Sequence, residues 1–162
     1  MKQLTFCTFE LLKNNSIKPV TSIKVTDFNQ NEVNLLEKYA NKILLLLFYN
    51  NACLGCTGRA IPLAYKFKQT YKDIEVIGIH SNFSSNNVTR DDILSIFTIN
   101  ELPFPIYIDN NHKMYDFFNS EGTPQWVLIT PNGEVYRSIF GSQDNAQNRL
   151  YYALESLTKT SN

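Results

Sequence analysis

The sequence predicts an α/β fold in which a central mixed β-sheet carries helices on both faces. The first observation is that short apolar runs alternate with segments of helical periodicity along most of the chain. The second is the turn Pro131-Asn132-Gly133 between two apolar runs, which is a strong β-hairpin signal. The alternating part implies parallel strands joined by right-handed crossovers, and the hairpin adds antiparallel strands.

The first part of the chain predicts two strands and one short helix. Apolar and polar residues alternate around Leu4–Phe9 and again around Ser22–Val25, which favours strands joined by a polar connection. Residues 29–32 predict a turn, and residues 35–39 predict a short helix ahead of the central strand.

The centre of the chain predicts a buried strand, a helix and a second buried strand. The run Ile43–Tyr49 is wholly apolar, as in a parallel strand that is covered on both faces. Residues 57–71 carry apolar side chains at helical spacing, and residues 74–79 form another short aliphatic run.

The second half predicts two short helices, three strands and a closing helix. Thr89 fits the N-cap of a helix over residues 89–97, which has acidic residues in its first turn. The remaining predictions are strands at 105–108, 126–129 and 135–140, a helix at 111–118, and a closing helix whose apolar face begins at Ala146.

Length and composition indicate one domain with an ordinary globular core. The 162 residues are 43% hydrophobic and 19% charged, as is typical of globular proteins. We expect a single domain over residues 1–162, with an N-terminal strand extension at 1–26 and the core at 27–158. The formal net charge of zero gives no indication of binding to nucleic acid or to an anionic membrane surface. The longest apolar run, which ends at Tyr49, is too short to span a bilayer.

The N-terminus and the cysteine content bear on the compartment. The first residues alternate apolar and polar side chains and do not resemble a signal peptide. We therefore expect a cytoplasmic protein as written, or a periplasmic or membrane-tethered one if an export segment has been removed. Three cysteines cannot all pair internally, which fits a reducing compartment better than a disulfide scaffold. Cys7 is interpreted as a small apolar residue on the first strand.

The main chemical signal is Cys53-Leu54-Gly55-Cys56, placed after the buried strand and at the start of the predicted helix. Backbone N–H groups and the partial positive charge at a helix N-terminus favour a thiolate, which is the nucleophilic form of cysteine. Two intervening residues place both sulfurs within disulfide reach. We expect Cys53 to attack the substrate, Cys56 to resolve the mixed disulfide, and Leu54 and Gly55 to shape access to Cys53.

Two other interpretations of the cysteine pair stay open from the sequence: a structural disulfide and half of a zinc site. Zinc requires further ligands, and the obvious candidates are Cys7, His80 and His112. The sequence contains no second Cys-x-x-Cys or His-x-His pair to complete such a site. We expect no metal, and no cofactor other than the redox-active disulfide of Cys53 and Cys56.

A second signal is Gly122-Thr123-Pro124, which directly precedes a predicted core strand. A proline there removes a hydrogen-bond donor of the sheet, and a trans, purely structural proline is one interpretation. Beside a redox-active cysteine pair, we expect instead a cis Thr123–Pro124 bond next to the sulfurs. The Thr123 backbone would then pair with an extended substrate, while Pro124 packs on the disulfide.

These segments resemble the thioredoxin superfamily, and within it the TlpA/ResA-like thiol–disulfide oxidoreductases. The resemblance runs from about Val20 to Leu157. Its matching pieces are Leu44–Phe48 before the cysteine pair, Pro62 in the next helix, residues 104–109, the helix at 89–97 in the place of the subgroup's insertion, and Gly122-Thr123-Pro124 leading into residues 127–135. The resemblance implies a thioredoxin-like three-layer sandwich, Cys53 as the exposed nucleophile, Cys56 as the resolving thiol and Pro124 as a cis proline.

The chain departs from this family pattern near the cysteines. Ala52 stands where members usually have tryptophan, Leu47 where thioredoxin has a buried acid, and Arg59 where many ResA-like members have glutamate. Pro62 also lies one residue further along than usual. Without an acid, no obvious general base assists Cys56, whereas Arg59 would stabilise a nearby thiolate and lower its pKa. We therefore expect a more oxidising or isomerase-like potential than that of thioredoxin.

These observations favour an enzyme that exchanges disulfides with protein thiols and is recycled by a thiol reductant, and we expect it to be a monomer. One alternative is a non-enzymatic redox sensor or adaptor, which the missing tryptophan and acids would suit. Another is a peroxiredoxin-like peroxidase. Such enzymes need a Pro-x-x-x-Thr-x-x-Cys loop, and the four residues before Cys53 include neither proline nor threonine.

Three further side chains carry weaker predictions. His80 follows the second buried strand, and we expect a half-exposed loop residue near the strand ends, where open sheets place their sites. We expect His112 to be solvated in a polar turn, and Trp126 to pack in the core.

Overall fold

The computed structural model of the protein describes residues 20–160, which contain a seven-stranded mixed sheet in the order β2-β1-β5-β4-β3-β6-β7. The elements, in chain order, are β1 Lys24–Thr26, β2 Glu32–Asn34, α2 Leu35–Lys38, β3 Ile43–Tyr49, η1 Cys56–Ala60, α3 Ile61–Thr70, β4 Ile74–Ser81, α4 Arg90–Leu94, β5 Ile106–Asp109, η2 Asn110–His112, α5 Lys113–Phe117, β6 Gln125–Ile129, β7 Val135–Phe140 and α6 Asp144–Thr160. The strand predicted at residues 4–9 lies outside the described residues, as does Cys7.

Strand β3 lies at the centre of the sheet and leads the chain to the cysteine pair. It pairs in parallel with β4 and antiparallel with β6, and all of its residues are buried. Its side chains alternate between the two faces, so that Leu45 and Leu47 enter one core while Leu44 and Leu46 enter the other. Burial on both faces is the physical reason why this strand is wholly apolar.

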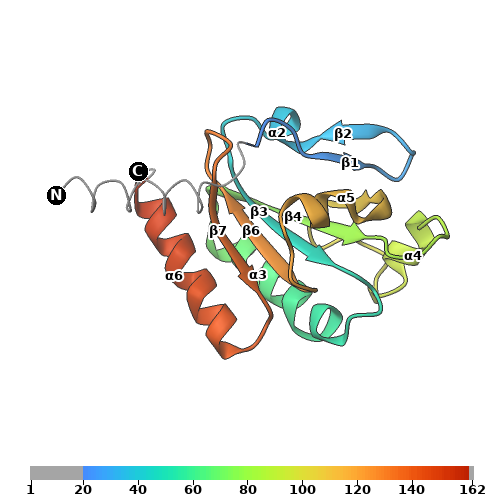
Figure 1. Cartoon of the computed structure of the whole chain (residues 1–162). Coiled ribbons are helices and arrows are strands. Elements are labelled where there is room, and N and C mark those ends of the chain that lie inside the picture. Colours follow the sequence, from blue (N-terminus) through green and yellow to red (C-terminus); the bar gives the residue numbers. More distant parts are fainter. Residues whose placement is uncertain (1–19, 161–162) are drawn as a thin grey trace, which may run out of the picture.

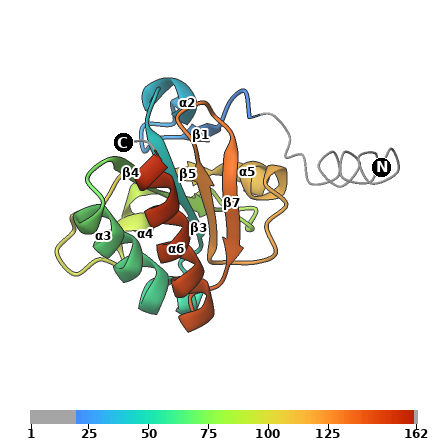
Figure 2. The same cartoon turned by 90° about the vertical axis from the view of Figure 1, so that its left-hand side faces the viewer.

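Two helical layers cover the sheet and give the three-layer arrangement that the sequence predicts (Figure 1). Helices α3 and α6 pack on one face, in the core that also holds Cys56. Helices α2 and α5 pack on the other face (Figure 2). Within residues 20–160, no helix is both long enough and apolar enough to cross a membrane.

The structure confirms the predicted order of strands and helices between residues 20 and 160 and corrects it in detail. The sequence does not predict β2, a short edge strand that pairs with β1, because three residues carry no readable periodicity. The helix predicted at 89–97 is limited to α4, and the helix predicted at 57–71 begins with the π-helical segment η1.

Candidate active site

The loop between β3 and the cysteine pair is a tight turn fixed by its own side chains; we call Asn50–Cys53 the redox loop. The N–H of Cys53 donates to the carbonyl of Asn50 at 3.0 Å and closes the turn. The Asn50 Oδ1 accepts the N–H of Ala52 at 2.9 Å, and its Nδ2 donates to the carbonyl of Ser81 at 2.9 Å. The turn is thereby attached to the end of β4, the parallel neighbour of β3.

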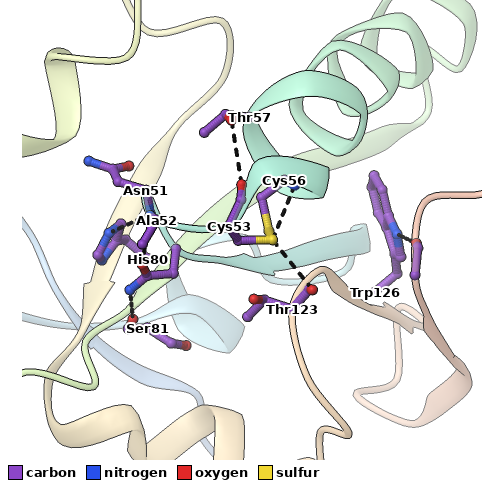
Figure 3. The surroundings of a disulfide bond; sticks show 11 residues. Asn51, Ala52, Cys53, Cys56, Thr57, His80, Ser81, Thr123 and Trp126 are labelled. Atoms are coloured by element: carbon purple, nitrogen blue, oxygen red, sulfur yellow. Dashed lines mark hydrogen bonds between the residues drawn. A yellow bond between two sulfur atoms is a disulfide. The ribbon is translucent and has the colours of Figure 1, made fainter.

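Cys53 and Cys56 form a disulfide, with Cα atoms 5.2 Å apart (Figure 3). Cys53 is partly exposed, whereas Cys56 is fully buried in the core that it shares with α3. The backbone N–H of Cys56 donates to the Cys53 Sγ at 3.2 Å. Once the disulfide is reduced, this hydrogen bond and the partial positive charge of the helix start favour a thiolate on Cys53. Cys53 is therefore the sulfur that another molecule can reach.

The loop before β6 lies directly against the disulfide. Its Thr123–Pro124 peptide bond is cis, as predicted, and the Thr123 carbonyl oxygen lies 3.4 Å from the Cys53 Sγ (Figure 3). The Pro124 carbonyl accepts the N–H of Gly141 at 2.8 Å, which ties this loop to the segment after β7. The fold thus brings a backbone carbonyl to the sulfur from a segment 70 residues further along the chain.

The two residues between the cysteines have different surroundings. Leu54 is 86% exposed, so an apolar side chain stands free at the rim of the disulfide. A Cβ on Gly55 would lie 3.4 Å from the Ser142 Oγ and 3.9 Å from the Pro124 Cδ. Both distances are ordinary van der Waals contacts, so a methyl group at position 55 would just fit between the start of the helix and the loop that carries Pro124.

The helix after Cys56 starts with a π-helical turn, η1, in which the N–H of Ile61 donates to the carbonyl of Cys56. A π-turn holds one residue more than an α-turn, which accounts for the extra residue between Cys56 and Pro62. Pro62 lies in the first turn of α3, where helices tolerate proline.

Arg59, which the sequence suggests as a tuner of thiolate pKa, is exposed on η1. Its guanidinium donates to the side-chain oxygen of Gln143, just before α6. Within residues 20–160, no hydrogen bond joins Arg59 to either sulfur. Its charge can therefore affect the cysteines only as a longer-range electrostatic interaction, which the surrounding water and salt screen.

His80 is a functional candidate that the sequence analysis placed wrongly. It belongs to β4 and is only 4% exposed, so the prediction of a half-exposed loop residue is wrong. Its Nε2 accepts the N–H of Asn51 at 3.2 Å (Figure 3), and its ring meets Tyr49 edge to face, with centroids 5.2 Å apart. Burial lowers the pKa of His80, which leaves a neutral ring that can accept a hydrogen bond at neutral pH. The sequence contains one signal for this contact, the position of His80 at the end of a buried strand.

The redox loop is also attached to α4. The Nδ2 of Asn51 donates to the carbonyl of Asp92 at 2.7 Å. A capping box starts this helix, since the Thr89 hydroxyl accepts the N–H of Asp92 and the Asp92 carboxylate accepts the N–H of Thr89. The predicted cap at Thr89 is confirmed, and its helix supports the loop before Cys53.

The remaining two side-chain predictions have different outcomes. Trp126 is buried, as predicted, and its Nε1 donates to the carbonyl of Gly141 at 2.9 Å. His112 is not simply solvated, because its ring stacks on Phe83 with centroids 5.0 Å apart and its Nδ1 lies 2.9 Å from the Asp116 carboxylate. The sequence does not reveal this contact because Phe83 comes from a different loop.

The part of the chain that the structure describes contains no group of three or more His, Cys, Asp or Glu side chains that could hold a metal ion. Among the zinc ligands considered from the sequence, His80 binds the redox loop and His112 pairs with Asp116. The chemistry that this arrangement can perform is reversible exchange of the Cys53–Cys56 disulfide with another thiol.

Comparison with known proteins finds relatives in sequence. Protein DipZ of Mycobacterium tuberculosis is 28% identical over 111 residues, which cover 67% of this chain and 16% of that protein. The chain therefore spans about a sixth of that relative's length. Thiol-disulfide oxidoreductase YkuV of Bacillus subtilis is 24% identical over 105 residues, covering 64% of this chain and 70% of YkuV.

Solved structures and a family match agree with the fold. A thiol-disulfide isomerase from Corynebacterium glutamicum superposes with a TM-score of 0.66 at 24% identity, covering 89% of this chain and 97% of the isomerase. This likeness shows a thioredoxin-like fold. Residues 17–138, which include the redox loop, the cysteine pair and the cis proline, match the AhpC/TSA family. Because the match covers most of the chain, this protein belongs to the thioredoxin-like AhpC/TSA family.

Proposed function

We propose that this protein is a thiol–disulfide oxidoreductase that exchanges disulfides with protein thiols through Cys53 and Cys56. The observation that carries the proposal is the unequal environment of the pair. Cys53 is partly exposed and its sulfur accepts the N–H of Cys56, whereas Cys56 is buried. The names of two matched proteins, a thiol-disulfide oxidoreductase and a thiol-disulfide isomerase, support the same reaction.

In the reducing direction, the Cys53 thiolate attacks one sulfur of a substrate disulfide. A new S–S bond joins Cys53 to that sulfur, and the other substrate sulfur leaves as a thiolate that takes a proton from water. Cys56 then gives up its thiol proton to water and attacks the Cys53 Sγ. The Cys53–substrate bond breaks, and the second substrate sulfur leaves as a thiolate that takes up a proton. The substrate gains two electrons and two protons, and a thiol reductant returns the protein to the dithiol. The same steps in reverse oxidise a substrate dithiol.

We assign substrate contacts to the rim of the disulfide. The Thr123 carbonyl lies 3.4 Å from the Cys53 Sγ, so the backbone of Thr123 and Pro124 borders the path of attack. A substrate in extended conformation would pair with the Thr123 backbone and cover the exposed Leu54 side chain. Gly55 keeps the helix start clear of a side chain beside this path.

Cysteine variants test the proposal. Reduced Cys56→Ser protein, mixed with a disulfide-containing protein such as insulin, is expected to accumulate a mixed disulfide on Cys53, because the resolving thiol is missing. Cys53→Ser should form none, and Cys7→Ser is the matched control with unchanged turnover. Peptide mass spectrometry identifies the linkage. No trapped species, or one on another cysteine, would contradict the proposal, and peroxide turnover by the pure protein would favour the peroxidase alternative.

We also propose that the pair is more oxidising than thioredoxin and that the protein acts as a monomer. The helix-start N–H on the Cys53 Sγ stabilises the reduced, thiolate form, which raises the potential. Equilibration in glutathione buffers with thiol trapping measures it. A midpoint above about −270 mV supports the proposal, and a midpoint at or below that of thioredoxin contradicts it. Sedimentation equilibrium tests the oligomeric state.

A further inference from the structure

Hydrogen bonds to two neighbouring elements hold the redox loop, Asn50–Cys53, in place. The side-chain amide of Asn50 binds the end of β4, and that of Asn51 binds α4. A third bond runs from the backbone N–H of Asn51 to the Nε2 of His80. Among the described residues it is the one bond in which a buried ring holds the backbone of this loop.

The position of this loop controls where the Cys53 sulfur lies. Cys53 is the last residue of the turn, two residues after Asn51. Its Sγ sits 3.2 Å from the Cys56 nitrogen and 3.4 Å from the Thr123 carbonyl oxygen. Hydrogen bonds weaken steeply with distance and angle, so a small shift of the turn would reduce the donation of the Cys56 N–H to the sulfur.

Packing alone does not favour a histidine at position 80. The ring is almost fully buried, and within residues 20–160 no other residue accepts a hydrogen bond from its Nδ1. Because the Nε2 accepts the Asn51 N–H, the Nδ1 carries the proton, and a buried donor without a partner destabilises the fold. An apolar ring against Tyr49 would avoid this cost but could not accept the Asn51 N–H.

We propose that His80 is a positioning residue for Cys53. Its Nε2 holds the Asn51 N–H and thereby fixes the turn that places the Cys53 Sγ on the Cys56 N–H. In Figure 3 the His80 ring lies against the Asn51–Ala52 backbone, on the side of Cys53 away from Trp126. The inference rests on the proposed function, since it names a residue that prepares the same nucleophile.

Three variants test the inference through the Cys53 thiol itself. His80→Phe keeps a buried ring without an acceptor, whereas His80→Gln offers its Oε1 close to the place of the Nε2. His112→Gln is the matched control, because that histidine contacts Phe83 and Asp116 instead of the redox loop. The reduced proteins are alkylated with iodoacetamide over a range of pH, and peptide mass spectrometry follows Cys53. The redox potential is measured in parallel.

The phenylalanine variant is expected to raise the pKa of the Cys53 thiol and to slow its alkylation at neutral pH by about three- to tenfold, the loss expected from one weakened hydrogen bond. Its potential should become more reducing. His80→Gln should restore the rate to within about twofold, and His112→Gln should match the wild type. An unchanged rate in His80→Phe overturns the inference, as does an equal loss in His80→Phe and His80→Gln.

If the phenylalanine variant does not fold, hydrogen exchange of backbone amides in the wild type tests the inference instead. The Asn51 amide should exchange at least about tenfold more slowly than an unprotected amide, and free exchange would overturn the inference. None of these measurements needs a substrate. If the protein does not exchange disulfides with other proteins, the proposed function is contradicted. The effect of His80 on the Cys53 thiol can still be measured in that case.

Discussion

At the residue scale, the two sulfurs of the pair differ in what surrounds them. Cys53 is partly exposed and accepts a backbone N–H, while Cys56 is closed off in the core. Sulfur at a helix start is stabilised as a thiolate, and burial in an apolar core has the opposite effect. The sequence predicts this division from the position of each cysteine relative to the helix, and the structure adds the particular donor.

We expect the charge of Arg59 to have a modest influence on the redox potential of the cysteine pair. Its guanidinium is exposed and engaged with Gln143, so solvent screens its field at the sulfurs. We expect Arg59→Gln to make the potential more reducing by up to about 15 mV, which corresponds to ~0.7 kcal/mol. Redox titration in glutathione buffers measures the shift, with Arg149→Gln on α6 as the control. A shift toward a more oxidising potential would contradict the assignment of Arg59 as a stabiliser of the thiolate.

Buried His80 should make stability depend on pH. Burial lowers its pKa in the folded protein below the ordinary value of 6.5, although interaction with the backbone carbonyl of His80 itself and with the Asp92 carboxylate acts in the opposite sense. As the pH falls, the unfolded chain therefore binds a proton before the folded one does. The contribution of neutral His80 is present above about pH 6.5 and is lost as the pH drops through the folded pKa.

Urea unfolding of the wild type and of His80→Gln, measured between about pH 7.5 and pH 5, checks this sign. The wild type should lose stability relative to the variant on acidification, because glutamine does not titrate. Parallel curves for the two proteins would show that His80 does not take up a proton on unfolding in this range.

At the element scale, the site depends on short elements that the sequence describes incompletely. The π-helical segment η1 absorbs one extra residue and leaves α3 free to begin near Pro62. Helix α4 has only five residues, and its carbonyl at Asp92 holds the Asn51 side chain. Because a helix of this length has little intrinsic stability, its cap and its packing decide whether it forms.

The Thr89 cap should therefore affect both the helix and the redox loop. Thr89→Ala removes the acceptor of the Asp92 N–H and is expected to lower the free energy of unfolding by about 0.5–2 kcal/mol. It should also speed amide exchange in the redox loop, which Asn51 ties to this helix. Thr70→Ala, at the end of α3, is the control and should stay within about 0.5 kcal/mol of the wild type. An equal effect of both variants would count against a special role for the cap.

At the scale of the whole molecule, the sheet separates two hydrophobic cores, and the cysteine pair belongs to one of them. The central strand β3 contributes alternate side chains to both, and Cys56 and Trp126 belong to the one beneath α3 and α6. Gly78 on β4 is tightly packed in this core, because an added Cβ would come within 2.9 Å of the Phe104 ring and 3.1 Å of Ile106. A side chain at that position would have to push aside the side chains of Phe104 and Ile106.

Gly78→Ala should lower the free energy of unfolding by about 1–3 kcal/mol through overpacking. Gly58→Ala is the matched control, since no atom beyond its chain neighbours and the backbone of its own helix lies within 4 Å of the added Cβ. Alanine at an exposed helical glycine should be neutral or stabilising by up to about 1 kcal/mol. Urea titration measures both variants, and a Gly78→Ala protein as stable as the wild type would show that Phe104 can move aside at little cost.

Much of the site follows from sequence because its signals are local. The apolar run of β3, the cysteine spacing and the Thr89 cap each depend on a few neighbouring residues. The sequence analysis fails at β2, which is too short to show a period, and at His80, whose polar side chain suggests exposure. A buried histidine is recognisable only when its partners are known.

Local signals in the chain predict the central strand, the cysteine pair at a helix start and the proline before β6, because periodicity and backbone restrictions act between near neighbours. The surroundings of the cysteine pair depend on long-range packing. The Thr123 carbonyl at Cys53, the Gln143 side chain at Arg59 and the His80 ring at the redox loop all come from distant parts of the chain. Strand pairing sets these contacts, and the residues of one segment do not indicate which distant segment packs beside it.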